Sequence, residues 1–237
     1  MIRPAALASF ALGVAASQAL AAQVIGDSRA PLSVDESNLA FRLVESQPDR
    51  PTFGGHTPSI DVRQMAEWIA ASGDNSGLPY IIVDKRDAKV FLFNGRSAIL
   101  GVASALLGLG RGDDSAAGIG HRRLATMAPV ERTTPAGRFQ ASLGFDLEQD
   151  VLWIDYDKAL SLHRVIVGNP LDRRHQRLVS PAVSDNRISY GCINVSASFY
   201  EEVVIPAFKG TVGMVYILPE TKTLDQVFAI DDSNAPL

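Results

Sequence analysis

The sequence predicts a mainly β domain, a β-sandwich or barrel-like fold with a few helices. Short runs rich in β-branched and aromatic residues follow one another along most of the chain, and few helical patterns separate them. Strands that alternated with long helical patterns would instead indicate a doubly wound parallel sheet. With 46% hydrophobic residues, the chain can also form one substantial core.

Residues 1–21 have the pattern of a secretory signal peptide. Arg3 supplies a positive charge, an apolar stretch runs from Ala5 to Val14, and Ala19-Leu20-Ala21 provides the small residues that precede a cleavage site. The apolar stretch is shorter than the ~20 residues that span a bilayer. We therefore expect an exported protein with no stable membrane insertion after signal removal.

Residues 22–77 are expected to form an N-terminal extension that contains one amphipathic helix. The first part is polar and shows no sustained periodicity. Further on, Asp61 and Gln64 resemble a helix-opening pair, and the helix should end near Ala71. Apolar residues at helical spacing form its buried face, namely Val62, Met65, Ala66 and Ile69.

The strand pattern begins with a hairpin. Tyr80 to Val83 and Val90 to Phe93 are β-rich runs on either side of a polar turn. Further strands are expected at Ser97 to Ala105, Arg138 to Leu143, Val151 to Ile154, Leu160 to Val167 and Val212 to Leu218. Between them, the glycine-rich segment from Gly108 to Gly112 is expected to be a mobile loop. It does not suit a phosphate, because Asp113 and Asp114 follow it and no helix opens there.

Charge and composition exclude several classes of partner. After signal removal, 21 basic residues face 26 acidic ones, so the net charge changes from −4 to −5. No basic run stands out, and we expect no nucleic-acid partner. The single cysteine and four scattered histidines do not have the spacing of a metal site, so no metal or other cofactor is expected.

Cys192, the only cysteine, is the candidate nucleophile. Structural cysteines of exported proteins usually come in pairs, so a solitary one is either a chance buried residue or a reactive thiol. Ser198 and Glu201 form a capping box, which predicts a helix directly after the cysteine. A helix N-terminus lowers the pKa of a nearby thiol. We also expect amides from Tyr190 to Cys192 to face a developing oxyanion, with Gly191 permitting close approach.

A cysteine nucleophile needs a base, and the four histidines differ in setting. His56 and His121 lie in irregular segments. His163 ends an alternating run, where a strand holds an imidazole in a defined place. His175 lies in a strongly charged loop. We favour His163 as the base and keep His175 as the alternative.

Three features follow one another along the chain: Thr134-Pro135-Ala136-Gly137-Arg138-Phe139, then His163, then Ser189-Tyr190-Gly191-Cys192-Ile193-Asn194. Together they resemble the active-site pattern of the L,D-transpeptidase (YkuD-type) family. The resemblance covers about residues 78–219, which leaves 220–237 as a C-terminal tail. It implies a mostly β catalytic fold, with Cys192 as nucleophile and His163 as base. It also implies peptidoglycan stem peptides as partners and a periplasmic or cell-wall location.

Within this pattern, Ser189, Tyr190 and Gly191 are expected to shape the oxyanion pocket. Tyr190 replaces the histidine that family members commonly have there, and a phenol does not act as a base at neutral pH. The gap between His163 and Ser189 is also longer than usual, which implies an insertion at about 167–185. If the family spacing holds strictly, His175 becomes the base.

Three further side chains are candidates for substrate binding: Arg138, Arg187 and Asn194. Arginine suits stem carboxylates because its guanidinium binds them in a bidentate manner.

The function that follows is a peptidoglycan L,D-transpeptidase, which forms a cysteine thioester with one stem and transfers it to an acceptor amine. Two alternatives remain. One is an L,D-carboxypeptidase or wall-protein-releasing hydrolase that uses the same thioester. The other is a non-catalytic cell-wall-binding module. No sequence feature indicates an oligomeric state.

Overall fold

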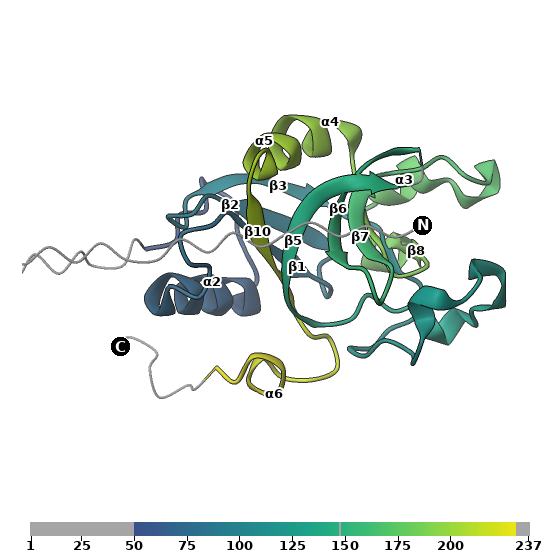
Figure 1. Ribbon diagram of the computed structural model, residues 1–237, viewed down its shortest axis with the longest axis horizontal. Helices are drawn as coiled ribbons and strands as arrows, with labels where there is room; N and C mark the ends of the chain where they lie inside the picture. The colour runs from purple at the N-terminus through teal and green to yellow at the C-terminus, as the bar shows by residue number, and fades with distance from the viewer. Residues whose placement is uncertain (1–49, 147, 231–237) are drawn as a thin grey trace, which may run out of the picture. The chain divides into compact units, whose positions relative to one another are not determined.

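The computed structural model describes residues 50–146 and 148–230, whose main feature is an eight-stranded β-sheet (Figure 1). The prediction of a mainly β fold is confirmed. The predicted signal peptide, the first part of the predicted extension and the end of the predicted tail lie outside the described residues. The strands of the sheet are β1 (Tyr80–Asp84), β2 (Lys89–Phe93), β3 (Ile99–Ser104), β5 (Gly137–Asp146), β6 (Gln149–Asp155), β7 (Leu160–Arg164), β9 (Ile193–Val195) and β10 (Val212–Ile217).

The sheet is nearly closed into a barrel. Its spatial order is β3-β2-β1-β10-β5-β6-β7-β9, with parallel pairs at β1–β10 and β7–β9 and antiparallel pairs elsewhere. Just after β3, Leu106 exchanges two backbone hydrogen bonds of 2.8 and 2.9 Å with Asn194 of β9. This contact, which we call the seam, brings the two edge strands together.

The predicted hairpin and strands are present. Strands β1 and β2 pair antiparallel from Tyr80–Phe93 to Asp84–Lys89. In the turn between them, the Asp84 carboxylate accepts hydrogen bonds from two backbone amides, those of Arg86 and Asp87. The five other predicted strands correspond to β3, β5, β6, β7 and β10.

Alternate residues of the central strands face two separate apolar clusters. Ile81 and Val83 of β1 belong to the cluster inside the barrel, whereas Tyr80 and Ile82 belong to the cluster outside it. Strand β1 is therefore buried on both faces.

Helix α2 (Ile60–Ser72) covers the outer cluster. Its buried residues are the four that the periodicity predicts: Val62, Met65, Ala66 and Ile69. The helix begins slightly earlier than expected, because the hydroxyl of Ser59 caps it by accepting a hydrogen bond from the Val62 amide. It ends at Gly73, which has a φ of +67°.

The helical segment after β9 covers the inner cluster. It comprises α4 (Ala197–Phe199), a π-helical stretch (Tyr200–Val204) and α5 (Ile205–Phe208). The helix expected after Cys192 is present, with Ser196 rather than Ser198 as its N-cap, but strand β9 lies between the cysteine and this helix. The thiol therefore does not lie at a helix N-terminus. Two further short helices are α3 (Arg174–Leu178) and α6 (Leu224–Phe228).

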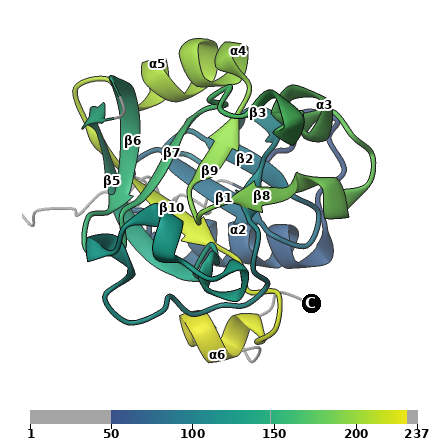
Figure 2. The same cartoon turned by 90° about the vertical axis from the view of Figure 1, so that its right-hand side faces the viewer.

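The glycine-rich segment predicted to be a mobile loop is tied down by hydrogen bonds. Its first residues form strand β4 (Leu107–Gly108), which pairs with β8 (Arg187–Ser189) in a separate two-stranded sheet. Gly110 then bridges to Thr133. In Figure 2, β9 lies between β7 and β8. This arrangement places the glycine-rich segment beside the chain that leads to Cys192.

Residues 50–230 belong to one compact unit, so α2 and α6 pack with the strands of the predicted 78–219 domain. Within the described ranges, no helix combines the length and apolar character needed to cross a bilayer.

Candidate active site

The parallel pair β7–β9 brings the predicted nucleophile and base to the same face of the sheet. His163 is the register partner of Asn194, and the preceding pair, Leu162 and Ile193, points into the inner core. Because side chains alternate along a strand, Ser161 and Cys192 share the outward face with His163 and Asn194. Cys192 thus lies one two-residue repeat, about 7 Å, before Asn194 along the sheet.

The Cys192 thiol is partly exposed and has polar neighbours. Its Sγ donates to the Ala159 carbonyl at 3.4 Å and accepts from the Ser161 hydroxyl at 3.6 Å. Burial raises the pKa of this thiol, the charge of Asp146 raises it further, and the Ser161 hydroxyl opposes both. The expectation that a helix lowers the thiol pKa is therefore wrong, and the thiol is protonated at neutral pH.

The His163 imidazole is buried and held at both nitrogens. Nδ1 lies 2.7 Å from the Arg164 carbonyl, and Nε2 lies 3.0 Å from the amide Nδ2 of Asn194. Since a carbonyl only accepts and an amide nitrogen only donates, the assigned tautomer carries its proton on Nδ1. Burial lowers the pKa of His163, as does the charge of Arg174, so the imidazole is neutral and Nε2 is its basic atom.

Thiol and imidazole share a face but no hydrogen bond joins them among the described residues. The Nε2 lone pair is instead used by Asn194. His175, the alternative base, is exposed on α3 and makes no hydrogen bond to Cys192 in the described part of the chain.

Ser189 and Gly191 shape the turn that presents the thiol. The Ser189 hydroxyl donates to the Cys192 carbonyl at 2.6 Å and accepts from the Gly191 amide at 3.1 Å. Gly191 has a φ of +135°, and a Cβ there would lie 2.9 Å from the Thr133 carbonyl oxygen. Only glycine fits this position without strain.

The Thr-Pro turn singled out in the sequence contacts this same loop. The buried hydroxyl of Thr134 donates to the Gly191 carbonyl at 2.7 Å and accepts from the Gly108 amide at 2.9 Å. Two motifs separated by more than fifty residues therefore form one hydrogen-bonded unit behind the thiol.

The expected oxyanion pocket is only partly available. The Gly191 amide is used by Ser189, which leaves the neighbouring amides of Tyr190 and Cys192 as the candidate donors. The Tyr190 ring packs under the Arg132 guanidinium, 4.2 Å from its carbon to the ring centroid. Arg132 thus holds the ring of Tyr190, which lies two residues before Cys192 in the chain.

Asn194 links the site to the inserted segment. Its amide oxygen accepts from Nη1 of Arg174 at 3.3 Å while its amide nitrogen donates to His163. The side chain is buried, and the two contacts together fix its orientation. The inserted residues 167–185 therefore reach the imidazole through one intervening side chain.

The two arginines expected to bind substrate lie elsewhere. Arg138 pairs with Asp74, with Nε 2.6 Å from the carboxylate, and so joins β5 to the end of α2. Arg187 is buried, donating to Glu220 at 2.7 Å and to the Lys85 carbonyl at 2.6 Å. Neither guanidinium is brought together with the Cys192 thiol.

Arg187 belongs to a buried ion cluster that the sequence did not reveal. Lys85 donates to the Asp113 carboxylate and to the carbonyls of Gly112 and Thr134, over 2.7 to 2.9 Å. The side chains of Lys85 and Asp113 are fully buried. Since Lys85 holds the Thr134 carbonyl, this ion cluster supports the turn that holds Gly191.

Sequence reasoning also missed Ser161, Arg174 and an aromatic pair. Trp153 is the register partner of Ser161 in β6, and its ring stacks on Tyr156 at 4.5 Å. The alternation around His163 contained the signal for Ser161. No sequence signal pointed to Arg174, because its partner is distant along the chain.

Within the described ranges, no cluster of three or more acidic, histidine or cysteine side chains suits a metal ion.

Comparisons with known proteins add only distant likenesses. No family model matches the chain, and none of the curated proteins does. Among solved structures, the helical cell shape determining protein Pgp2 from Campylobacter jejuni matches at 15% identity with a TM-score of 0.40, over 66% of this chain and 55% of that one. A mutant of Pgp2 matches at 14% and 0.40, over 70% of this chain and 58% of that one.

A fused Zn-dependent amidase/peptidase/peptidoglycan-binding domain-containing protein from Clostridium acetobutylicum matches at 14% identity with a TM-score of 0.34. The alignment covers 68% of this chain and 64% of that one. This chain thus spans less than two thirds of the chains it resembles. Likenesses this distant do not bear on function, which is argued from the site alone.

Proposed function

We propose that the protein is an exported cysteine acyltransferase of the L,D-transpeptidase type, acting on peptidoglycan stem peptides. One observation supports this most directly. The thiol of the half-buried Cys192, in a hydrogen-bonded glycine turn, lies one strand repeat before Asn194, the register partner of His163, and the neutral His163 imidazole carries its proton on Nδ1. Nucleophile, base and orienting group are the parts that covalent acyl transfer requires.

In the proposed acylation, the Cys192 proton passes from Sγ to Nε2 of His163, and the sulfur attacks the carbonyl of an L,D peptide bond. Nε2 must first exchange its Asn194 partner for the thiol. The C–S bond forms, amides of Tyr190 and Cys192 stabilise the oxyanion, and the C–N bond breaks. The leaving amine takes the proton from Nε2, and a thioester remains.

In the second step an acceptor amine gives its proton to Nε2 and attacks the thioester, so that an amide forms and the thiol regains its proton. Water in place of the amine would release the shortened stem. The Arg164 carbonyl stabilises the imidazolium in both steps, because it accepts from Nδ1 throughout. We place this activity in residues 78–219 and in the periplasm or cell wall.

The test uses purified protein and a tetrapeptide stem that ends in a D-amino acid, with mass spectrometry of the protein and its products. The wild type should acquire a thioester at Cys192 and release or exchange the terminal residue. Cys192→Ala should form no adduct. His163→Gln should slow acylation by about 10²- to 10⁴-fold, the usual contribution of a general base. His121→Gln, which alters an exposed histidine of the 119–121 turn, is the matched control.

If His175 is the base instead, the large loss will appear in His175→Gln and not in His163→Gln. If neither the stem nor a carbapenem acylates the wild-type thiol, the proposal of a catalytic cysteine is wrong.

A further inference from the structure

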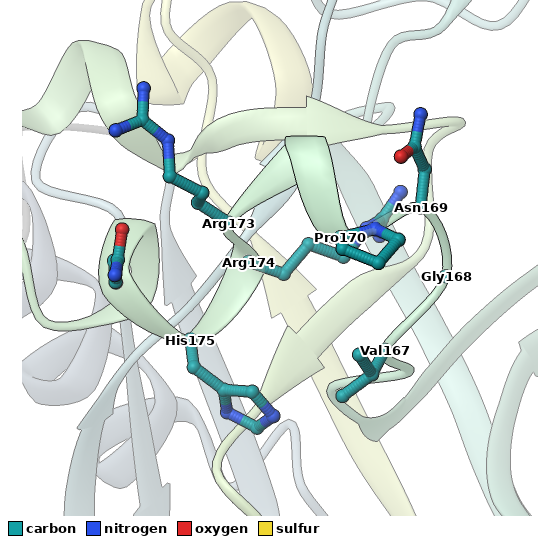
Figure 3. A pocket seen from close by; sticks show the side chains of 8 residues that line it. Val167, Gly168, Asn169, Pro170, Arg173, Arg174 and His175 are labelled. Carbon is teal, nitrogen blue, oxygen red and sulfur yellow. The ribbon is translucent and has the colours of Figure 1, made fainter.

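A hollow of about 250 Å³ lies in the inserted segment next to the candidate site (Figure 3). Residues 167–170 form one wall and residues 173–176, at the start of α3, form the other. The His175 ring and the Val167 side chain lie on opposite walls (Figure 3). We call this the insertion hollow.

The insertion hollow is connected to the imidazole through two hydrogen bonds. Arg174, one of its lining residues, donates to Asn194 at 3.3 Å, and Asn194 donates to His163 at 3.0 Å. The positive charge of Arg174 lowers the pKa of His163. Whatever occupies the insertion hollow therefore lies within electrostatic range of the base.

The lining of the insertion hollow favours an anion. It includes Arg173 and Arg174 and contains no acidic residue. The nearest carboxylate partner is Asp172, 3.3 Å from Nε of Arg174, a loose contact that leaves other donors of the guanidinium for a ligand. Arginine binds carboxylates with two parallel hydrogen bonds.

The size and the apolar walls restrict the ligand further. Drug-sized ligands need cavities of about 300 to 1,000 Å³, so this volume suits a group of about one amino acid. Val167 and Pro170 supply apolar surface. The inserted segment also exposes other large apolar side chains, including Leu171 and Val179, at 83% and 79%.

The spacing fits a residue joined to the carbonyl that Cys192 attacks. Cys192 lies one strand repeat from Asn194, about 7 Å. One extended residue spans about 3.5 Å, and a charge-assisted hydrogen bond adds about 2.8 Å. A leaving residue that extends along the strand from Cys192 toward Asn194 would bring its carboxylate toward the side chain that Arg174 contacts.

We propose that the insertion hollow binds the carboxylate-terminated residue that leaves the donor stem, with Arg174 binding the carboxylate. This inference rests on the proposed acyl transfer. As the C–S bond forms and the C–N bond breaks, the leaving residue takes the proton from His163 on its new amine and departs as a free amino acid. The donor substrate is thus a stem with a free α-carboxylate directly after the attacked carbonyl.

The experiment compares two tetrapeptide stems that differ only at the C-terminus, one a free acid and the other a primary amide. Hydrogen bonds to a charged group contribute about 10- to 100-fold to a rate or affinity. For the wild type, kcat/KM for acylation of Cys192 should therefore be higher by that factor with the acid than with the amide. Arg174→Gln should lose this preference, so that the acid and the amide react at similar rates, whatever loss both peptides share through Asn194 and His163. Arg96→Gln, an exposed arginine in the turn after β2, is the control.

If the acid and the amide acylate the wild type at equal rates, the inference is wrong, and this result requires no variant. An equal loss on both peptides in Arg174→Gln also overturns it, because Arg174 would then act only by positioning Asn194. If neither peptide acylates Cys192, the proposed acyl transfer itself fails, and the inference fails with it.

Discussion

At the scale of single residues, the Cys192 thiol and the His163 imidazole are both uncharged at rest. Burial is the main cause for each, since it raises the pKa of the thiol and lowers the pKa of the imidazole. A preformed thiolate–imidazolium pair would show the opposite shifts. In the proposed reaction, substrate binding must therefore bring Sγ and Nε2 together.

The buried imidazole predicts an acid sensitivity of folding. The folded-state pKa of His163 lies below the unfolded value of about 6.5, so its contribution to stability is complete above that pH and is lost as the pH falls toward the folded pKa. The free energy of unfolding should fall more between pH 7.5 and pH 5 in the wild type than in His163→Gln. Urea titrations at several pH values measure this.

His121→Gln controls for the removal of a histidine. Equal slopes of stability against pH in the wild type and His163→Gln would contradict the burial of a neutral imidazole.

Some of the site was accessible from the sequence and some was not. The only cysteine, the glycine before it and the alternation around His163 are local patterns, and the structure places Cys192 and His163 on one face. The partner of Arg174 is 20 residues away along the chain, and those of Lys85 are at least 27 residues away. Such pairings depend on the topology, which no local pattern specifies.

At the scale of elements, the turn before β9 is defined by contacts from two other segments. Ser189 spans the turn, and Thr134 binds the carbonyl of Gly191. Strands β8 and β9 have only three residues each, too few to show an alternating pattern. This is why the sequence predicted the helix that follows Cys192 but not the short strand between them.

Gly191→Ala tests this turn. The new Cβ would meet the Thr133 carbonyl oxygen at 2.9 Å, and a φ of +135° is strained for alanine. We expect a loss of about 1–3 kcal/mol in the free energy of unfolding, together with loss of thiol acylation. Denaturant titration and adduct mass measure the two effects.

Gly168→Ala is the matched control, since a Cβ there meets nothing within 4 Å. Wild-type stability in Gly191→Ala would show that the turn has a different backbone conformation.

At the scale of the whole molecule, the buried ion cluster joins segments that are far apart in the chain. Lys85 follows β1, Asp113 follows the glycine-rich segment, Arg187 is in β8 and Glu220 follows β10. Burial lowers the pKa of Lys85, against the attraction of Asp113 and Glu220. Burial would raise the pKa of Asp113, but hydrogen bonds from Lys85, Thr221 and nearby amides lower it overall.

Lys85→Met removes the central cation, so the buried Asp113 carboxylate loses its charged partner and two carbonyls lose a donor. Breaking a buried pair in this way costs about 3–5 kcal/mol, which we expect as a lowered denaturation midpoint. Arg86→Met, which breaks an exposed pair with Asp61, should cost at most about 1 kcal/mol. Similar losses in the two variants would contradict a structural role for the cluster.

The mainly β architecture followed from the sequence because long strands carry strong apolar patterns, as in β1 and β2. The glycine-rich segment was mistaken for a mobile loop because its order depends on Asp113, whose partners lie more than 100 residues further on. Acidic residues after glycines ordinarily indicate solvent exposure.

The seam between Leu106 and Asn194 has a consequence for thermal behaviour. The main chain of Asn194 joins the two edge strands, while its side chain orients the imidazole. Loss of the Leu106 contact would change the position of Asn194, and with it the imidazole, while the other strand pairs stayed formed. Heat would then abolish the proposed turnover in a molecule that still looks native to circular dichroism, and cooling would restore it.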